Sequence, residues 1–348
     1  MNVNLKAILL ASAMMVPASG ALAADSMKMI MNWTADSAHL GFAVAQVNGL
    51  YEAADLDVEL EEGRGSSVAA QLVATGQADV GFADAGAILN VASQGAPIKI
   101  ISTIWKAGQF GIVSLKSENI QSPADLKGKK IAVAPGSAQA TLLPVLLAKN
   151  GMTEADVEIV SSAQNAFLGL ITSGAVDAAA ETPENLVVPL KDEGYEASNM
   201  YFYEHGVPLV SLSLVAREDK LNANPDAYKR FLKATAEGWK QAMADPAAAV
   251  AALREVFPEV SKSDDALMQG ATYSFSSVCP DGTGDVIGVT DAAKWDDIYG
   301  VMTSAMGLTK DKPVTDYYTL DYVPAEPITC PYPVRGRARS RALPRLPA

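Results

Sequence analysis

The stretch NWTADSAHLG, residues 32–41, joins the first predicted strand to the first predicted helix, and the interpretation of the whole chain depends on it. A tryptophan, a histidine and several short polar residues gather where ligands bind in open α/β sheets, outside the carboxyl ends of the strands. In one interpretation Trp33 belongs to the core and Asp36 or Ser37 only caps the helix. In the other, Trp33 and His39 contact a ligand.

The N-terminus has the pattern of a secretory signal peptide. Lys6 precedes an apolar run over residues 7–16, and the sequence ALA at 21–23 fits a cleavage site. The run is too short for a membrane-spanning helix, which needs roughly 20 apolar residues. We therefore expect residues 1–23 to be removed and the mature chain to be periplasmic.

The charge balance argues against a nucleic-acid partner. The chain carries a formal net charge of −13, and the signal contains one lysine and no acid, so the mature chain carries −14. Nucleic-acid binding requires a basic surface that displaces counterions from phosphates. The basic cluster of this chain, arginines over 335–345, alternates with proline, glycine and small residues. We predict a disordered tail over 331–348 and assign it no function.

Cys279 and Cys330 are the only cysteines in the sequence. The oxidising compartment that the signal peptide implies permits them to pair as a disulfide. Two buried free thiols are the alternative, and the sequence leaves both open.

Strand and helix patterns alternate along the mature chain, which is typical of parallel sheets covered by helices. One α/β unit extends to about residue 104, and the pattern starts again near Phe110. A strand over 209–216 is long enough to return the chain to the first unit, against which the later helices are expected to pack. The other predicted strands are 27–33, 56–60, 78–83, 98–104, 110–115, 131–134, 157–161 and 176–180, and the first predicted helix is 38–51.

Little in the sequence indicates catalysis. Catalysis at neutral pH usually needs a titrating base, an activated nucleophile or a metal site, and the chain has only two histidines, His39 and His205. It contains no H-E-x-x-H, C-x-x-C, G-x-S-x-G or G-x-x-x-x-G-K-[ST] pattern. Binding without chemistry is the favoured function.

Short polar or small residues recur where a predicted strand gives way to a helix. Helix N-termini present free N–H groups, so such junctions suit an anionic or hydrogen-bonding ligand. Two units facing each other would bring both sets together, although each residue alone is explained as an ordinary helix cap. The candidate residues at these junctions are Ser37, Ser66, Ser67, Asp84, Gly136, Ser137 and Ala138.

The opening stretch is also where the sequence resembles a known family. Residues 32–41, with GLY at 49–51 and LDVE at 56–59, are similar to the D-W-T-x-N-x-x-H-x-G, G-x-Y and G-L-x-V patterns of the SsuA/THI5-like (NMT1) family. This is a family of periplasmic solute-binding proteins of ABC importers. Further matches are GQADVG at 76–81, DLKGKKIAV at 125–133 and GAVDA at 174–178, and the resemblance covers about residues 25–325.

The resemblance implies a type II-like, two-lobed α/β fold in which each lobe is a mainly parallel sheet flanked by helices. Crossover strands near 107–115 and 208–217 would divide the chain into lobe 1, residues 24–108 and 216–330, and lobe 2, residues 109–215. A hinge would close the lobes over a ligand that contacts both. The implied partners are a small-molecule solute, an ABC permease and an ATPase subunit; the binding protein is expected to be a monomer without a cofactor.

Members of the family bind thiamine-precursor pyrimidines, aliphatic sulfonates, taurine, nitrate or other small organic ligands. The W-T-x-x-x-x-H pattern favours the pyrimidine branch, in which Trp33 would stack on a flat ring and His39 would hydrogen-bond at its edge. Glu181 would accept from an exocyclic amine, with a solvated acid at a strand end as the alternative, and Asp84 could do the same. Trp105 is either a second aromatic wall or a core residue.

Other functions stay open. A sulfonate or nitrate site would need arginine or several N–H groups, and Arg64, more simply a surface residue, is the obvious cation at a lobe 1 junction. The superfamily also includes the eukaryotic thiamine pyrimidine synthase, but that enzyme carries a cysteine-rich motif that this chain lacks, so we expect no enzyme activity. A secreted interaction or chemosensory adaptor would share the fold.

Overall fold

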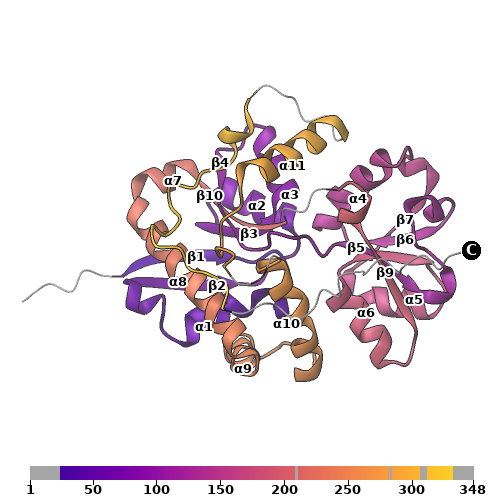
Figure 1. Ribbon diagram of the computed structural model, residues 1–348, viewed down its shortest axis with the longest axis horizontal. Coiled ribbons are helices and arrows are strands. Elements are labelled where there is room, and N and C mark those ends of the chain that lie inside the picture. The colour runs from indigo at the N-terminus through magenta and orange to yellow at the C-terminus, as the bar shows by residue number, and fades with distance from the viewer. Residues whose placement is uncertain (1–23, 208–210, 281, 283, 306–311, 332–348) are drawn as a thin grey trace, which may run out of the picture.

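The computed structural model describes residues 24–207, 211–280, 282, 284–305 and 312–331 of the 348-residue chain. These residues form two lobes, each built on its own five-stranded sheet (Figure 1). The predicted signal peptide, the tail from residue 332 onward and residues 208–210 of the predicted second crossover lie outside the described residues. Of the helices described, none has the length and apolar character needed to span a membrane.

Lobe 1 is built on a mixed sheet with the strand order β2-β1-β3-β10-β4. Strands β2 and β3 lie parallel to β1, whereas β10 runs antiparallel to both β3 and β4. The strands are β1 (Asp25–Ile30), β2 (Leu56–Glu61), β3 (Val80–Asp84), β4 (Ile98–Thr103) and β10 (Leu212–Arg217).

Lobe 2 repeats this arrangement with the strand order β7-β6-β8-β5-β9. Strands β7 and β8 lie parallel to β6, and β5 runs antiparallel to β8 and β9. Both sheets are therefore mixed rather than mainly parallel, because the strand that enters each lobe from the other runs against its neighbours. The strands are β5 (Gly111–Leu115), β6 (Lys130–Val133), β7 (Glu158–Ser161), β8 (Ala178–Glu181) and β9 (Ala197–Tyr201).

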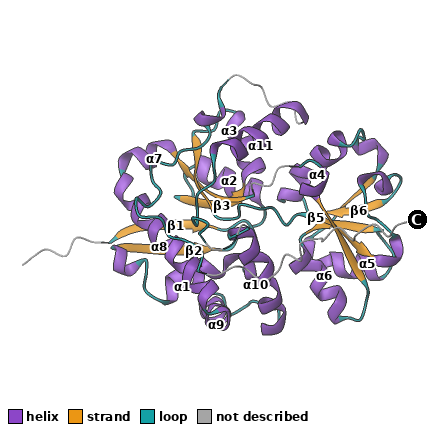
Figure 2. Ribbon diagram, viewed as in Figure 1, coloured by secondary structure: helices purple, strands orange, loops and turns teal. Residues whose placement is uncertain are grey.

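Helices flank both sheets (Figure 2). The helices of lobe 1 are α1 (Leu40–Val47), α2 (Ser66–Ala74), α3 (Ala85–Ser93), α7 (Glu218–Ala223), α8 (Pro225–Ala244), α9 (Pro246–Val256), α10 (Asp264–Val278) and α11 (Ala292–Ala305). Lobe 2 carries α4 (Ala138–Lys149), α5 (Phe167–Thr172) and α6 (Pro183–Asp192). Helix α10 also touches α6, so the C-terminal region of lobe 1 contacts lobe 2 beside the cleft.

Two elements correct the sequence-based boundaries. Strand β10 begins at Leu212 and belongs to the sheet of lobe 1, whereas the predicted boundary between residues 215 and 216 assigned its first four residues to lobe 2. The sequence also missed β9, an edge strand that pairs only with β5. Four of its five residues are half-buried, so no alternation of apolar and polar side chains marks it.

The opening stretch ends where α1 packs against α8. A Cβ at Gly41 would lie 2.3 Å from the ring of Trp239, and a Cβ at Gly238 would lie 2.3 Å from the carbonyl oxygen of Gly41. The two helices come this close because neither position carries a side chain. Phe42 and Phe82 extend the cluster edge to face, with ring centroids 4.9 Å apart. The helix itself begins at Leu40 and ends at Val47, within the predicted range 38–51.

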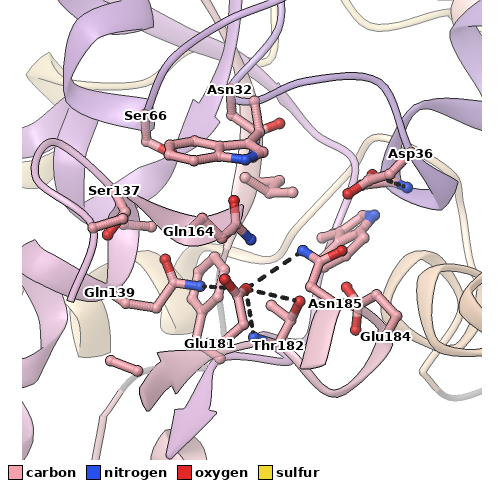
Figure 3. Close-up of a pocket in the computed structure, with 18 residues that line it drawn as sticks. Asn32, Asp36, Ser66, Ser137, Gln139, Gln164, Glu181, Thr182, Glu184 and Asn185 are labelled. Carbon is pink, nitrogen blue, oxygen red and sulfur yellow. Dashed lines mark hydrogen bonds between the residues drawn. The ribbon is translucent and has the colours of Figure 1, made fainter. Parts of the chain in front are cut away.

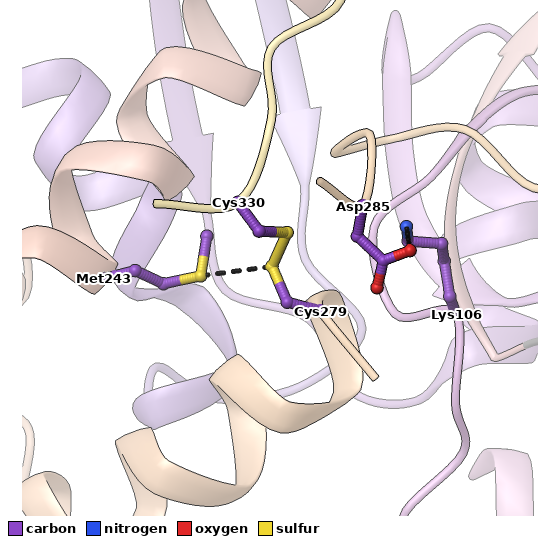
Figure 4. The surroundings of a disulfide bond; sticks show 5 residues. All are labelled: Lys106, Met243, Cys279, Asp285 and Cys330. Atoms are coloured by element: carbon purple, nitrogen blue, oxygen red, sulfur yellow. Dashed lines mark hydrogen bonds and ion pairs between the residues drawn. A yellow bond between two sulfur atoms is a disulfide. The ribbon is translucent and has the colours of Figure 1, made fainter. Parts of the chain in front are cut away.

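A disulfide joins Cys279, just after α10, to Cys330, so the pair that the sequence left open is bonded (Figure 4). The Cys330 N–H donates to the carbonyl oxygen of Asp285 over 2.9 Å, and the Asp285 carboxylate lies 3.2 Å from the Lys106 Nζ. Lys106 belongs to the segment between β4 and β5, and its N–H donates to the Ser277 carbonyl oxygen over 2.8 Å. These contacts tie the C-terminal segment of lobe 1 to the start of the first crossover.

Candidate ligand-binding site

The two lobes enclose a pocket with about 490 Å³ of empty space, a volume that includes open solvent. Lobe 1 contributes the loop after β1 and the start of α2, and lobe 2 contributes the starts of α4 and α6 and the end of β8 (Figure 3). The lining residues are Asn32, Trp33, Asp36, Ala38, Ser66, Trp105 and Leu212, with Phe110, Ala134, Ser137, Ala138, Gln139, Gln164, Ala180, Glu181, Thr182, Glu184 and Asn185.

The loop after β1 places Asn32 and Trp33 at the pocket wall. Strand β1 ends at Ile30, and the carbonyl oxygens of Asn32 and Trp33 accept from the N–H groups of Gly65 (2.7 Å) and Gly63 (3.1 Å). The Trp33 side chain is half-buried, lines the pocket and packs against the apolar cluster of lobe 2. The predicted stacking residue therefore stands on the wall that both lobes share.

His39 lies behind the pocket rather than in its lining, which corrects the predicted ligand contact. Its side chain is fully buried; Nδ1 accepts the N–H of Asp36 over 3.1 Å, and Nε2 lies 2.9 Å from the Asn32 Oδ1. The Nδ1 atom also lies 3.2 Å from the Asp36 Oδ1, so both ring nitrogens are engaged within the protein. His39 thus fills the place of Glu or Gln in a capping box with Asp36, and it orients two residues that do line the pocket.

Asp36 is more than the helix cap that the sequence indicated. Burial alone would raise the pKa of its carboxyl group, but the Lys262 ammonium, 3.5 Å away, together with His39 and the Ala38 N–H, holds that pKa well below its usual range. The Ala38 N–H donates to Oδ1 over 2.8 Å. Asp36 therefore presents a charged carboxylate to the pocket. Ser37, in contrast, donates to the Leu267 carbonyl oxygen and stays in a structural role.

Glu181 ends β8 with its carboxyl group in the pocket floor, so the solvated acid considered from the sequence is not what the structure shows. Its Oε1 accepts from the Thr182 N–H (2.7 Å) and hydroxyl (3.2 Å), and from the amides of Gln139 and Asn185, both at 3.4 Å (Figure 3). Burial raises the pKa of Glu181 to about 7, even though the Thr182 and Asn185 donors favour the ionised form.

Glu184, in the first turn of α6, is a second buried acid that the sequence did not single out. Burial, together with the nearby charges of Asp36 and Glu181, raises its pKa to about 8 against the opposing effect of Lys262. Its Oε2 has no hydrogen-bond partner among the described residues, and neither has the Gln164 Oε1 nor the Trp105 Nε1. Buried polar atoms are normally paired, so three residues that line the pocket each keep one polar atom without a partner.

The small residues at the lobe junctions divide into two groups. Ser66, Ser137 and Ala138 line the pocket; the Ser66 Oγ accepts from the Asp84 N–H over 3.1 Å, and the Ser137 Oγ caps α4 by accepting from the Ala140 N–H over 3.1 Å. Ser67 and Gly136 do not line it. The Ser67 N–H donates to the Gly136 carbonyl oxygen over 3.2 Å, a backbone contact between the lobes.

Three further predicted residues have distinct positions. Trp105 is 1% exposed and lines the pocket, so it is both a wall and a core residue. Asp84 does not line the pocket: it caps α3 through the Gly86 N–H (2.9 Å) and accepts from the Ser211 hydroxyl (3.3 Å). Burial raises the pKa of Asp84 to about 7. Arg64 borders a different surface hollow and is not part of the pocket.

The sequence missed several pocket residues, namely Asn32, Gln139, Gln164, Glu184 and Asn185, and Lys262 beside them. Glu184 and Asn185 follow the same strand-to-helix junction as Glu181, so the rule that ligands bind at such junctions could have found them. Gln164 begins the short 3-10 helix between β7 and α5, at another such junction, whereas Lys262 lies in the loop between α9 and α10 and has no such signal. No group of three or more His, Cys, Asp or Glu among the described residues could hold a metal ion.

Comparison with known proteins gives one family. A family model described as NMT1/THI5 like matches residues 36–249. A Haemophilus influenzae protein named for thiamine biosynthesis is 27% identical over 201 residues, 57% of this chain, and the match spans only 64% of that relative's length. A 4-amino-5-hydroxymethyl-2-methylpyrimidine phosphate synthase of Uromyces fabae is 26% identical over 74% of this chain and 78% of its own.

A formylaminopyrimidine-binding protein of Halalkalibacterium halodurans is 24% identical over 69% of this chain and 73% of its own. Among solved structures, the alkanesulfonate-binding protein SsuA of Xanthomonas axonopodis bound to MOPS superposes with a TM-score of 0.67 at 16% identity, covering 84% of this chain and 98% of its own. At this identity the likeness shows the fold alone, that of the periplasmic binding proteins.

Proposed function

Because this chain belongs to the NMT1/THI5-like family, we propose that it is the substrate-binding component of an ABC importer that captures a small planar nitrogen heterocycle, a thiamine-precursor-like pyrimidine, between its lobes. The observation that carries the proposal is the composition of the pocket. An indole from lobe 1 faces buried carboxyl and amide groups from lobe 2 across the pocket.

The buried acids suit an aminopyrimidine edge. Glu181 and Glu184 have pKa values raised by burial to about 7 and about 8, so each can hold a proton near neutral pH. A protonated carboxyl group donates to a ring nitrogen and accepts from the neighbouring amino group at the same time. Trp33 supplies a flat apolar surface for the ring, and stacking of this kind tolerates different substituents.

The same pocket disfavours an anionic ligand. Its lining includes three acids, Asp36, Glu181 and Glu184, and neither arginine nor lysine. A sulfonate or nitrate would bring a further negative charge into a buried pocket beside the ionised Asp36 carboxylate, at a cost that only strong donors could offset. Because the similar SsuA structure is that of a sulfonate-binding protein, binding of these anions is measured beside that of the pyrimidines.

Binding without turnover is supported by the state of the one histidine near the pocket. Both ring nitrogens of His39 are engaged within the protein, by the Asp36 N–H and the Asn32 amide, so neither is free to move a proton on a ligand. The relative from Uromyces fabae is named as a synthase. Assaying for turnover of the bound compound is accordingly part of the experiment.

The compartment and partners follow from the same proposal. We propose a periplasmic monomer that delivers its solute to a permease and an ATPase subunit; a disulfide between Cys279 and Cys330 suits an oxidising compartment. Lobe closure over the ligand would be a population shift, and the pocket meets its requirement because both lobes supply contacts.

Calorimetry on the purified mature protein tests the ligand class. We expect 1:1 binding of 4-amino-5-hydroxymethyl-2-methylpyrimidine or its formylamino analogue, with the compound recovered unchanged, and no binding of alkanesulfonate, taurine or nitrate. Binding of a sulfonate together with no binding of either pyrimidine would refute the proposed ligand class. Native mass spectrometry of protein purified without refolding would identify a co-purified solute directly.

A further inference from the structure

Lys262 reaches from lobe 1 to both sides of the cleft. It lies in the loop between α9 and α10, with its Nζ 3.5 Å from the Asp36 Oδ2 of lobe 1, and it donates a hydrogen bond to the Asn185 Oδ1 of lobe 2. The Asn185 amide nitrogen in turn lies 3.4 Å from the Glu181 Oε1. A continuous polar chain thus runs from one lobe, through the ammonium, to the acid in the pocket floor.

These polar contacts lie on the outer side of the pocket. A second hollow, with about 620 Å³ of empty space that includes open solvent, is lined by Lys262 and its neighbours Val260 and Ser261. It shares four residues with the inner pocket: Trp33, Asp36, Gln164 and Asn185. The hollow is therefore the outer chamber of the same cleft, and Lys262 stands where the chamber meets the pocket.

The loop that carries Lys262 is itself held in place. The Arg254 guanidinium of α9 donates to the carbonyl oxygens of Val260 (3.0 Å) and Lys262 (2.5 Å), and its Nε lies 2.5 Å from the Asp264 Oδ1. One planar donor group thus fixes both ends of the short segment. The ammonium is positioned by lobe 1 before it meets Asn185, so the contact with lobe 2 needs little further ordering of the loop.

We propose that Lys262 is the latch of the cleft: its ammonium joins Asp36 to Asn185 when the lobes meet, slows ligand release and selects what the outer chamber accepts. The inference deepens the proposed function and rests on it. An ammonium has three N–H donors; Asn185 accepts from one, and the Asp36 carboxylate lies beside the ammonium as its ion-pair partner. A remaining N–H can donate to a carbonyl or other acceptor on the ring, whereas a second cation at this point would be repelled. If Lys262 acts in this way, the protein should bind heterocycles with neutral or acceptor-bearing substituents and reject those with cationic ones.

The test compares Lys262→Met and Lys262→Arg with Lys233→Met, a change at an exposed lysine of α8. Stopped-flow tryptophan fluorescence with 4-amino-5-hydroxymethyl-2-methylpyrimidine measures association and dissociation rates, and small-angle X-ray scattering measures the radius of gyration without and with this probe. We expect Lys262→Met to speed dissociation about tenfold or more, the order lost with one charge-assisted hydrogen bond, and to enlarge the unliganded protein. Arg should retain most of the effect because it keeps the charge.

A double-mutant cycle with Asn185→Ala separates the latch from general disturbance of the pocket. If the two residues act through their mutual contact, Lys262→Met should change dissociation and the radius of gyration much less in the Asn185→Ala background. Additive effects, or a Lys262→Met variant that matches Lys233→Met in both measurements, would overturn the proposal. If the pyrimidine does not bind but Lys262→Met still increases the radius of gyration, the ligand class is refuted, and the role of Lys262 in joining the lobes is retained.

Discussion

Glu184 should lower the free energy of unfolding of the unliganded protein as the pH rises, and Glu184→Gln should remove the part of this decrease that Glu184 causes. Burial raises the pKa of this carboxyl group from its ordinary 4.5 to about 8. The folded protein therefore binds more protons than the unfolded chain between these pH values. By linkage, stability is fully present below about pH 4.5, declines through neutral pH and levels off above about pH 8.

The size of the effect follows from the width of that window. Each pKa unit corresponds to about 1.4 kcal/mol, so a displacement from 4.5 to about 8 corresponds to roughly 5 kcal/mol as an upper bound. Relaxation around the charge reduces this, and we expect Glu184→Gln to be about 2–4 kcal/mol more stable than the wild type at pH 9 and close to it at pH 5. Glutamine keeps the shape of the side chain and cannot ionise.

Urea unfolding at a series of pH values between 5 and 9 measures this difference. Glu193→Gln, an exposed position just after the same helix, is the matched control and should follow the wild-type curve. Glu181 and Asp84 also have raised pKa values and will leave part of the slope in every variant. Curves for Glu184→Gln and wild type that stay parallel from pH 5 to 9 would refute the assignment of a buried proton to Glu184.

Three further outcomes are expected. Trp33→Ala should weaken pyrimidine binding by roughly 1–3 kcal/mol in calorimetry, the order of a lost stacking contact; unchanged affinity in a folded variant would remove Trp33 from the site. Gly41→Ala should lower the free energy of unfolding by roughly 1–3 kcal/mol or more, because its methyl group would overlap the Trp239 ring, and wild-type stability in urea would contradict that packing. Reducing the Cys279–Cys330 bond, which closes a loop with a sequence separation of 51, should cost about 4 kcal/mol by loop entropy. A thiol assay on denatured, unreduced protein should find no free cysteine, and two free thiols would exclude the bond.

The fold was accessible from sequence because it depends on local periodicity. Alternating strand and helix patterns indicated two α/β units, whereas β9 was missed because it is a half-exposed edge strand. The boundary near residue 215 was wrong because periodicity shows that β10 is a strand but not which sheet it joins. Strand pairing is a long-range property, and only the contacts of β10 with β3 and β4 decide it.

The pocket was only partly accessible for the same reason. The motif identified Trp33 and the region of Asp36, and the strand-to-helix junctions identified Ser66, Ser137 and Glu181. Sequence could not show that His39 turns both ring nitrogens to its own loop, because a histidine looks the same as ligand or as cap. Nor could it bring Lys262 to Asn185, since that contact exists only through the packing of one lobe on the other.

The contacts that hold the first crossover also limit where the connection between the lobes can bend. The N–H groups of Lys106 and Ala107 both donate to the Ser277 carbonyl oxygen, and the Lys106 ammonium faces Asp285 in the segment tied down by the disulfide (Figure 4). Up to residue 107 this connection is therefore held by lobe 1, and the Gln109 amide also donates to the Ser276 hydroxyl of α10 over 3.3 Å. If the lobes rotate as we propose, the bend of this crossover falls next to Phe110, which lines the pocket, so the movement would change the pocket wall directly.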